Sequence, residues 1–255
     1  MTVSAVAYAV TVFLLLPTIL IIPMSFGPDR YLHFPPNGFT LHWYAEFFAD
    51  PEWVDSTLFS LRIAVLTMIV ATVVGTLVSL ALVRGRLPGK SLFELLVVGP
   101  VIVPNIALAI AMFLVFDRLR LTGTTVGFVV AHTALALPFV IFTLLASLYR
   151  FDADLERAAL SCGAGPLRAF FHVTLPLIAP GVVSAALFAF IISFDEPVIS
   201  FFISDLDHKS LPRKMFEDID YNISPTLAAV ATMLTGLTLL ALTAGHFLRR
   251  GMSRS

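Results

Sequence analysis

The sequence predicts an all-α integral membrane protein with six transmembrane helices and both termini in the cytoplasm. First, 58% of the 255 residues are apolar and only 13% are charged, and the mean hydropathy is +0.93. A soluble domain of this size needs a polar surface, which 16 basic and 17 acidic side chains cannot provide. Second, six windows of 21 to 29 residues contain no Asp, Glu, Lys or Arg. Third, basic residues gather in a short loop after the second window and again after the last.

The same composition excludes other classes of protein. The apolar excess argues against a cytosolic enzyme and against a disordered chain. A net charge of −1 leaves no basic face for a nucleic-acid partner. The single cysteine, Cys162, excludes an intrachain disulfide and argues against a cysteine-based metal site.

Each of the six windows fits one membrane crossing. A helix needs about 20 apolar residues to cross about 30 Å of hydrocarbon, so no window is long enough for two crossings. The apolar runs are continuous rather than alternating, which excludes an outer-membrane β-barrel. The first window lacks a basic leading region and a small-x-small cleavage site, so we expect a retained helix that Pro17 and Pro23 bend. In a single domain over 1–255, the helices are expected at about 5–26, 58–83, 93–116, 124–149, 177–203 and 225–248.

The loops set the orientation. Three basic residues lie within the loop 84–90 and two more at 249–250, and the positive-inside rule places both stretches in the cytoplasm. The outer segment 27–56 contains an aromatic stretch that we expect to form a short helix at the membrane interface. The outer segment 204–224 is the most charged part of the chain. The longest cytoplasmic segment runs from Arg150 to about Pro176.

Two adjacent acids interrupt the fifth apolar window at its outer end. Asp195 and Glu196 directly precede Pro197, where a break in the helix is expected. One interpretation makes them a cation-attracting wall of a translocation pathway. The other places them at the membrane boundary, solvated or paired with Arg62 or Arg118. Since neighbouring helical residues point in different directions, at most one of the two acids is expected to face a pathway.

Other polar or aromatic candidates are weaker. Asn105, directly after Pro104, could line the pathway with its amide or form a hydrogen bond between helices. Phe194 could belong to a hydrophobic gate. His132 is expected to be a hydrogen-bonded packing residue rather than a ligand. We expect no metal ligands and no catalytic residues in the chain.

The cytoplasmic segment 152–176 predicts two short helices joined by a bend. Asp154 is expected to cap the first helix, with Glu156 in its first turn and Gly163 ending it. Pro166 can begin the second helix. An i, i+3, i+4 stripe follows at Leu167, Phe170 and Phe171. Two such helices outside the membrane require a partner surface.

A spaced set of residues in this segment identifies a family. Ala158-Ala159, Gly163, Val173 and Leu175-Pro176 resemble the "EAA" signature of ABC importer permeases. The resemblance implies the type I importer permease fold and a helix that docks in a cleft of the ATPase. The chain departs from the signature at Arg157, which stands at the glutamate position directly after Glu156. The residues implied in ATPase coupling are Glu156, Arg157, Ala158, Ala159, Gly163, Ala164, Leu175 and Pro176.

Further stretches are similar to one subgroup, the permeases for spermidine and putrescine. They are Pro100–Ile106, Ser193–Pro197, Leu211–Met215 and Ser224–Thr226. The resemblance implies that the chain moves polyamines from a periplasmic binding protein into the cytoplasm. Permeases for thiamine, opines, phosphonates and ferric iron share parts of these stretches, so another small amine, an opine or a phosphonate is the alternative substrate. A secondary transporter is a more distant alternative, because it would need an inverted repeat that the sequence does not display.

The resemblance also implies partners. They are two ATPase subunits, a second, homologous permease, a periplasmic binding protein and the lipid bilayer of a bacterial inner membrane. The chain has no Gly-x-x-x-x-Gly-Lys-[Ser/Thr] motif, so we expect the partner ATPase to bind ATP and Mg²⁺. The chain itself is expected to have no cofactor and no enzyme activity.

Overall fold

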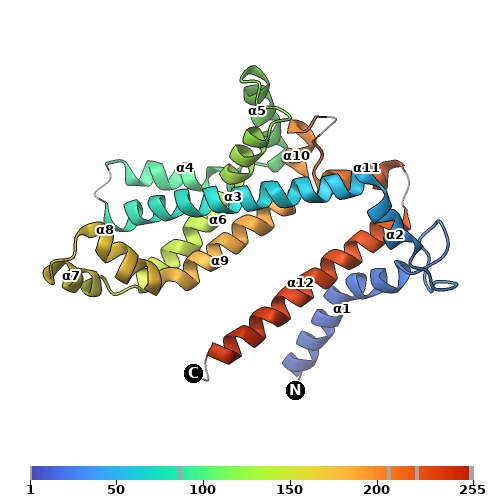
Figure 1. Cartoon of the computed structure of the whole chain (residues 1–255), viewed down its shortest axis with the longest axis horizontal. Helices are drawn as coiled ribbons and strands as arrows, with labels where there is room; N and C mark the ends of the chain where they lie inside the picture. Colours follow the sequence, from blue (N-terminus) through green and yellow to red (C-terminus); the bar gives the residue numbers. More distant parts are fainter. Residues whose placement is uncertain (1, 86–87, 206–207, 222–223, 253–255) are drawn as a thin grey trace. The chain divides into compact units, whose positions relative to one another are not determined.

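The computed structural model describes residues 2–85, 88–205, 208–221 and 224–252, and within these ranges it contains helices and no strands (Figure 1). The chain divides into two compact units, which are described separately: one of residues 55–213 and one of residues 1–54 with 214–255. The α-helices, with the π-helical turn η1, are α1 (Thr2–Met24), α2 (His42–Ala49), α3 (Pro51–Arg84), α4 (Lys90–Ile102), α5 (Asn105–Arg118), α6 (Thr125–Arg150), α7 (Ala153–Ser161), α8 (Pro166–Ala169), η1 (Phe170–Thr174), α9 (Leu175–Phe194), α10 (Val198–Ile203), α11 (Leu211–Tyr221) and α12 (Pro225–Met252).

The core of the 55–213 unit forms around α6. Helix α9 runs along α6, and α10 packs against both α5 and α6 (Figure 1). Small side chains allow close approach: a side chain at Gly75 would collide with Val140, and one at Gly181 would collide with Ser147. Buried alanines of α3, α6 and α9 complete this packing: Ala71, Ala136, Ala185 and Ala189.

The predicted single helix over 93–116 is wrong. The chain forms α4 and α5 there, and the two helices meet at a bend of 110°. Pro104 is the physical cause, because it lacks an N–H donor and forces the preceding residue out of helical geometry. Val103 is accordingly extended, with φ −74° and ψ 133°.

The predicted fifth helix over 177–203 is also divided. Helix α9 ends at Phe194, and α10 begins after the break that Asp195, Glu196 and Pro197 form. The break itself was expected from Pro197. Helix α3 begins at Pro51 rather than near 58, so its first two turns include residues of the outer segment.

Four described helical stretches are long and apolar enough to cross a membrane. They are Ser4–Met24, Pro51–Arg84, Thr125–Arg150 and Pro166–Phe194. The bent pair α4–α5 makes a fifth if it is counted as one span, and Pro225–Leu240 of α12 is a shorter apolar helix. The count of six spans and the cytoplasmic placement of both termini stay predictions.

The other unit contains α1, α2 and α12, and α12 packs against both other helices. The expected interfacial helix is α2. Its Trp43 is buried and donates from Nε1 to the Gly27 carbonyl oxygen at 2.7 Å. The ring of Phe26 stacks on that of Phe39 and on that of Tyr44, which anchors the preceding loop to α2.

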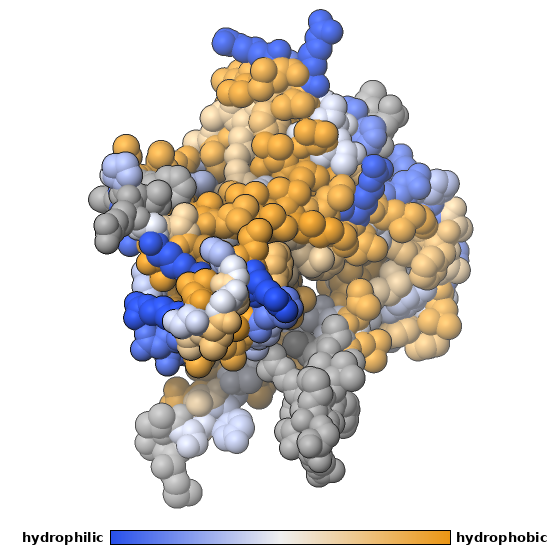
Figure 2. All heavy atoms as spheres, turned by 60° about the vertical axis from the view of Figure 1, so that its left-hand side comes forward, coloured by the Kyte–Doolittle hydropathy of each residue, from blue (hydrophilic) through white to orange (hydrophobic). Residues whose placement is uncertain are grey.

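Large apolar side chains cover much of the face shown in Figure 2, whereas hydrophilic residues gather in separate patches. On α9, for example, Val183, Leu187 and Ile191 are each more than half exposed. Exposed apolar side chains along one helix in this number indicate that lipid or protein covers them.

Candidate functional site

The segment 152–176 forms the most distinctive site of the 55–213 unit. Helix α7 begins after Asp152, whose Oδ1 accepts a hydrogen bond from the Asp154 N–H at 2.9 Å. The expected cap, Asp154, is therefore wrong: Asp152 has the extended backbone of a cap, and Asp154 already lies in the helix. Glu156 lies in the first turn, as predicted.

The end of α7 at Gly163 is confirmed and has a defined geometry. Gly163 has φ +89°, in the left-handed region that glycine adopts without steric cost. Its N–H donates to the Leu160 carbonyl at 3.0 Å, and the Ala164 N–H donates to the Ala159 carbonyl at 3.1 Å. These two bonds form a Schellman motif, which satisfies carbonyls that the helix end would otherwise leave free.

The second half of the segment differs from the separate short helix that was expected. Helix α8 does begin at Pro166, but it passes through the π-helical turn η1 directly into α9. Of the predicted stripe, Leu167 is 75% exposed and Phe171 is 56% exposed. The segment is thus continuous with a membrane helix and presents apolar side chains outward.

Helix α7 itself buries none of its residues. Leu155 and Leu160 are both exposed, which is costly for a short helix in water. Arg157 forms an exposed ion pair with Asp154 at 2.7 Å. A pair of this kind contributes about 0.2–0.5 kcal/mol within a helix, so exchanging it for another contact would cost little.

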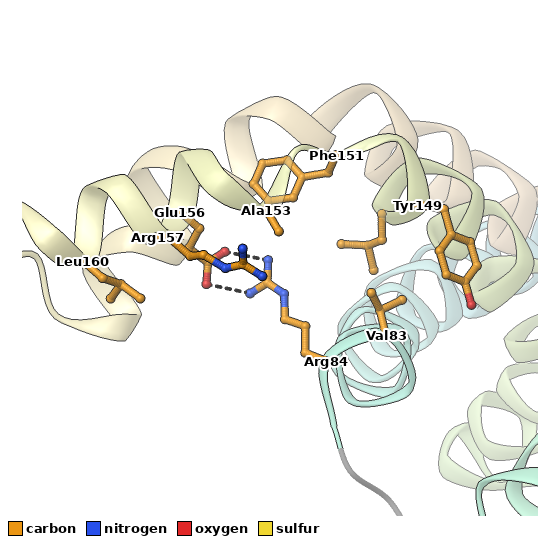
Figure 3. Close-up of a pocket in the computed structure, with 9 residues that line it drawn as sticks. Val83, Arg84, Tyr149, Phe151, Ala153, Glu156, Arg157 and Leu160 are labelled. Atoms are coloured by element: carbon orange, nitrogen blue, oxygen red, sulfur yellow. Dashed lines mark hydrogen bonds and ion pairs between the residues drawn. The ribbon is translucent and has the colours of Figure 1, made fainter.

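Glu156 points the other way, into its own chain. Its carboxylate accepts from both terminal nitrogens of Arg84, Nη1 at 2.8 Å and Nη2 at 2.6 Å (Figure 3). The hydroxyl of Thr174 also donates to this carboxylate. Arg84 and Thr174 were not expected at this site; the only sequence signal for Arg84 is that it directly follows an apolar window.

A cavity of about 480 Å³ adjoins this contact (Figure 3). It lies among the end of α3, the end of α6 and the exposed helix α7. The Arg84 guanidinium lies 5.9 Å from the centre of the Phe151 ring. The residues that line the cavity include Val83, Arg84, Tyr149, Phe151, Glu156 and Leu160.

The side chains of the two acids after α9 lie in different environments, as expected for adjacent residues. Asp195 is exposed, whereas Glu196 is buried. Glu196 Oε1 accepts the N–H of Ile199 at 3.0 Å and so caps the start of α10. Glu196 thus has a local structural partner, and Asp195 is the acid that faces outward.

The other pathway candidates lie on separate elements. Asn105 is the exposed first residue of α5, and Phe194 ends α9 with its ring stacked on Phe190 at 5.8 Å. Among the described residues, no hydrogen bond or ring contact joins Asn105, Phe194, Asp195 and Glu196 to one another. His132 is confirmed as a packing residue, since it is buried and its Nδ1 shares a 2.9 Å hydrogen bond with Ser193 Oγ.

The sequence of residues 71–252 matches the family model described as "Binding-protein-dependent transport system inner membrane component". The chain is 30% identical over 250 residues to the spermidine/putrescine transport system permease protein PotC of Haemophilus influenzae, covering 97% of this chain and 96% of the relative. It is 29% identical over 236 residues to the putrescine transport system permease protein PotI of Escherichia coli K12, covering 88% and 82%.

The fold also has a counterpart among solved structures. A chain of a bacterial ABC transporter involved in the import of the acidic polysaccharide alginate superimposes with a TM-score of 0.75, covering 97% of this chain and 95% of the other. At 17% identity this likeness concerns the fold alone. Together with the apolar helices and the signature around Gly163, the family match shows that this chain belongs to the binding-protein-dependent transport system inner membrane components and is a multi-pass inner-membrane permease subunit of an ABC transporter.

Proposed function

We propose that this permease moves polyamines, putrescine or spermidine, from a periplasmic binding protein into the cytoplasm. The observation that carries the proposal is the similarity to PotC, which extends over 97% of this chain. The exposed carboxylate of Asp195, beside the break between α9 and α10, supports it. Amines are cationic at neutral pH, and the charge of a carboxylate attracts them. The alternative keeps the architecture and replaces the cargo by another small amine, an opine or a phosphonate.

A permease of this family works with an ATPase, a binding protein and a second permease. We propose in detail that α7 docks in a cleft of the ATPase, that two ATPase subunits are present, and that these subunits hold ATP and Mg²⁺. The exposed apolar residues of α7 and α8 support the docking, because a partner surface would cover them. In this scheme the chain needs no cofactor of its own and transmits motion rather than catalysing hydrolysis.

Arg157 and the Schellman turn at Gly163 would form the contact surface. The usual glutamate of the signature is replaced by a cation here, so the matching position on the ATPase is expected to be acidic or neutral. Glu156 does not replace the missing glutamate in this scheme, because Arg84 and Thr174 bind its carboxylate.

Uptake by cells tests the polyamine assignment. We expect a strain without this chain to lose high-affinity uptake of labelled putrescine or spermidine, and a plasmid copy to restore it. Competition with unlabelled opines and phosphonates serves as the control for cargo. Unchanged polyamine uptake in the deletion strain, with loss of uptake of one of the competitors, would contradict the assignment and leave the permease architecture in place.

A further inference from the structure

Among the described residues, a polar contact that spans three elements joins helix α7 to the rest of its unit. Arg84 lies at the end of α3, Glu156 in α7, and Thr174 at the end of η1. The Glu156 carboxylate is bound on one side by the Arg84 guanidinium at 2.6 and 2.8 Å, and on the other by the Thr174 hydroxyl. Arg84 Nη2 also donates to Thr174 Oγ1 at 3.4 Å, which closes a triangle.

This contact is shielded more than the other ion pair of α7. The Glu156 side chain is 18% exposed, whereas both side chains of the Asp154–Arg157 pair are 76% exposed. Thr174 is fully buried. Two parallel hydrogen bonds between a guanidinium and a carboxylate also fix the geometry, which a single exposed pair does not.

The contact links α7 to α9 independently of the chain that connects them. Between α7 and α8 the chain passes through the Schellman turn at Gly163 and then through Gly165, where the absence of a Cβ atom allows the connection to bend. The contact between Glu156 and Thr174 bypasses that connection and ties α7 to the residue directly before α9. Thr174 also ends the π-helical turn, a rare feature that is frequent at functional sites.

We propose that Arg84, Glu156 and Thr174 form a brace, which makes α7 move as one body with the adjoining ends of α3 and α9. The proposal rests on the proposed function, in which the ATPase moves α7. When the ATPase shifts α7, the brace passes the displacement to two membrane helices directly, whereas the glycine connection alone would absorb it. The three are positioning residues, and none of them needs to contact the substrate or the ATPase.

The single cysteine provides a direct test in the full-length chain. Cys162 is exposed at the end of α7, so a spin label attached there reports the mobility of this helix in lipid nanodiscs. We expect Arg84→Glu and Glu156→Arg each to raise the label's mobility. The double variant Arg84→Glu with Glu156→Arg is expected to return it to the wild-type value, since the Thr174 hydroxyl can donate to a carboxylate or accept from a guanidinium.

Thr174 offers a matched pair of variants that keeps all charges. Thr174→Ser retains the hydroxyl and should leave the label as immobile as in the wild type. Thr174→Val keeps the shape, removes the tie to η1 and should raise the label's mobility, by less than loss of the Arg84–Glu156 pair does. In the complete transporter, the single charge variants and Thr174→Val should retain the ATPase subunits on purification. In these variants, the stimulation of ATP hydrolysis that the loaded binding protein causes should fall about tenfold. The double variant Arg84→Glu with Glu156→Arg should restore the stimulation to within about threefold of the wild-type value.

Either of two results would overturn the brace. One is a label mobility in both single charge variants equal to that of the wild type. The other is a label mobility in Thr174→Val equal to that in Thr174→Ser and in the wild type. The label measurement needs neither ATPase nor substrate. A failure of the wild-type complex to move polyamines would therefore refute the proposed function without affecting the mobility result.

Discussion

Replacing Gly163 by valine is expected to abolish uptake while the chain still inserts in the membrane. Gly163 has φ +89°, and a β-branched residue in the left-handed region costs about 1–2 kcal/mol or more. Apart from the adjoining residues of the chain, no heavy atom in the described part of the structure lies within 4 Å of a Cβ atom placed there, so the demand for glycine is conformational. Loss of the turn would displace the end of α7 and the surface proposed to meet the ATPase. The measurement is uptake of labelled polyamine together with co-purification of the ATPase.

Gly165 provides the matched control for this change. It lies two residues further on, has φ −70° and also has open space around it. Gly165→Ala is therefore expected to keep both uptake and ATPase binding. Normal uptake by Gly163→Val, at a membrane level equal to that of the wild type, would refute the coupling role of this turn.

Changing Asp195 to asparagine is expected to weaken polyamine uptake about tenfold, chiefly as a higher KM, which corresponds to about 1.4 kcal/mol of lost attraction. Asparagine keeps the size of the side chain and removes its charge, so the effect isolates electrostatics. The measurement is the concentration dependence of putrescine and spermidine uptake, with spermidine affected more because it bears the larger charge.

Glu196→Gln is the matched comparison for Asp195. The amide oxygen of glutamine can still accept the Ile199 N–H, so the cap of α10 is retained. We expect this variant to transport nearly normally, and the double variant to resemble Asp195→Asn. Unchanged kinetics for Asp195→Asn would place this acid at a solvated boundary instead of in the pathway.

Much of the fold could be predicted because its determinants are local. The glycine turn after α7, the start of α8 at Pro166 and the break before Pro197 each depend on the conformational preference of one residue. The bend between α4 and α5 likewise depends on the conformational preference of one residue, Pro104. Two prolines in an apolar window permit either a kinked helix or two helices, and no local pattern distinguishes the two. In the structure Pro104 ends the first helix, and α5 packs with Ala109 and Phe116 in the core.

The inward role of Glu156 could not be predicted in this way. Its partner Arg84 is 72 residues distant in the sequence, and nothing in either local pattern links them. The cap of α7 illustrates the same limit at short range. Asp152 and Asp154 are both competent caps, and the choice depends on where the chain leaves the helical geometry of α6 at Phe151.

The most direct test of the account is transport by the purified system in proteoliposomes. The vesicles would contain this chain, its second permease and the ATPase, with ATP enclosed and the binding protein and labelled putrescine or spermidine outside. We predict accumulation of polyamine inside that requires ATP and stops when this chain is omitted. Uptake that proceeds equally without ATP, or ATP-driven accumulation of another solute with none of either polyamine, would contradict the account.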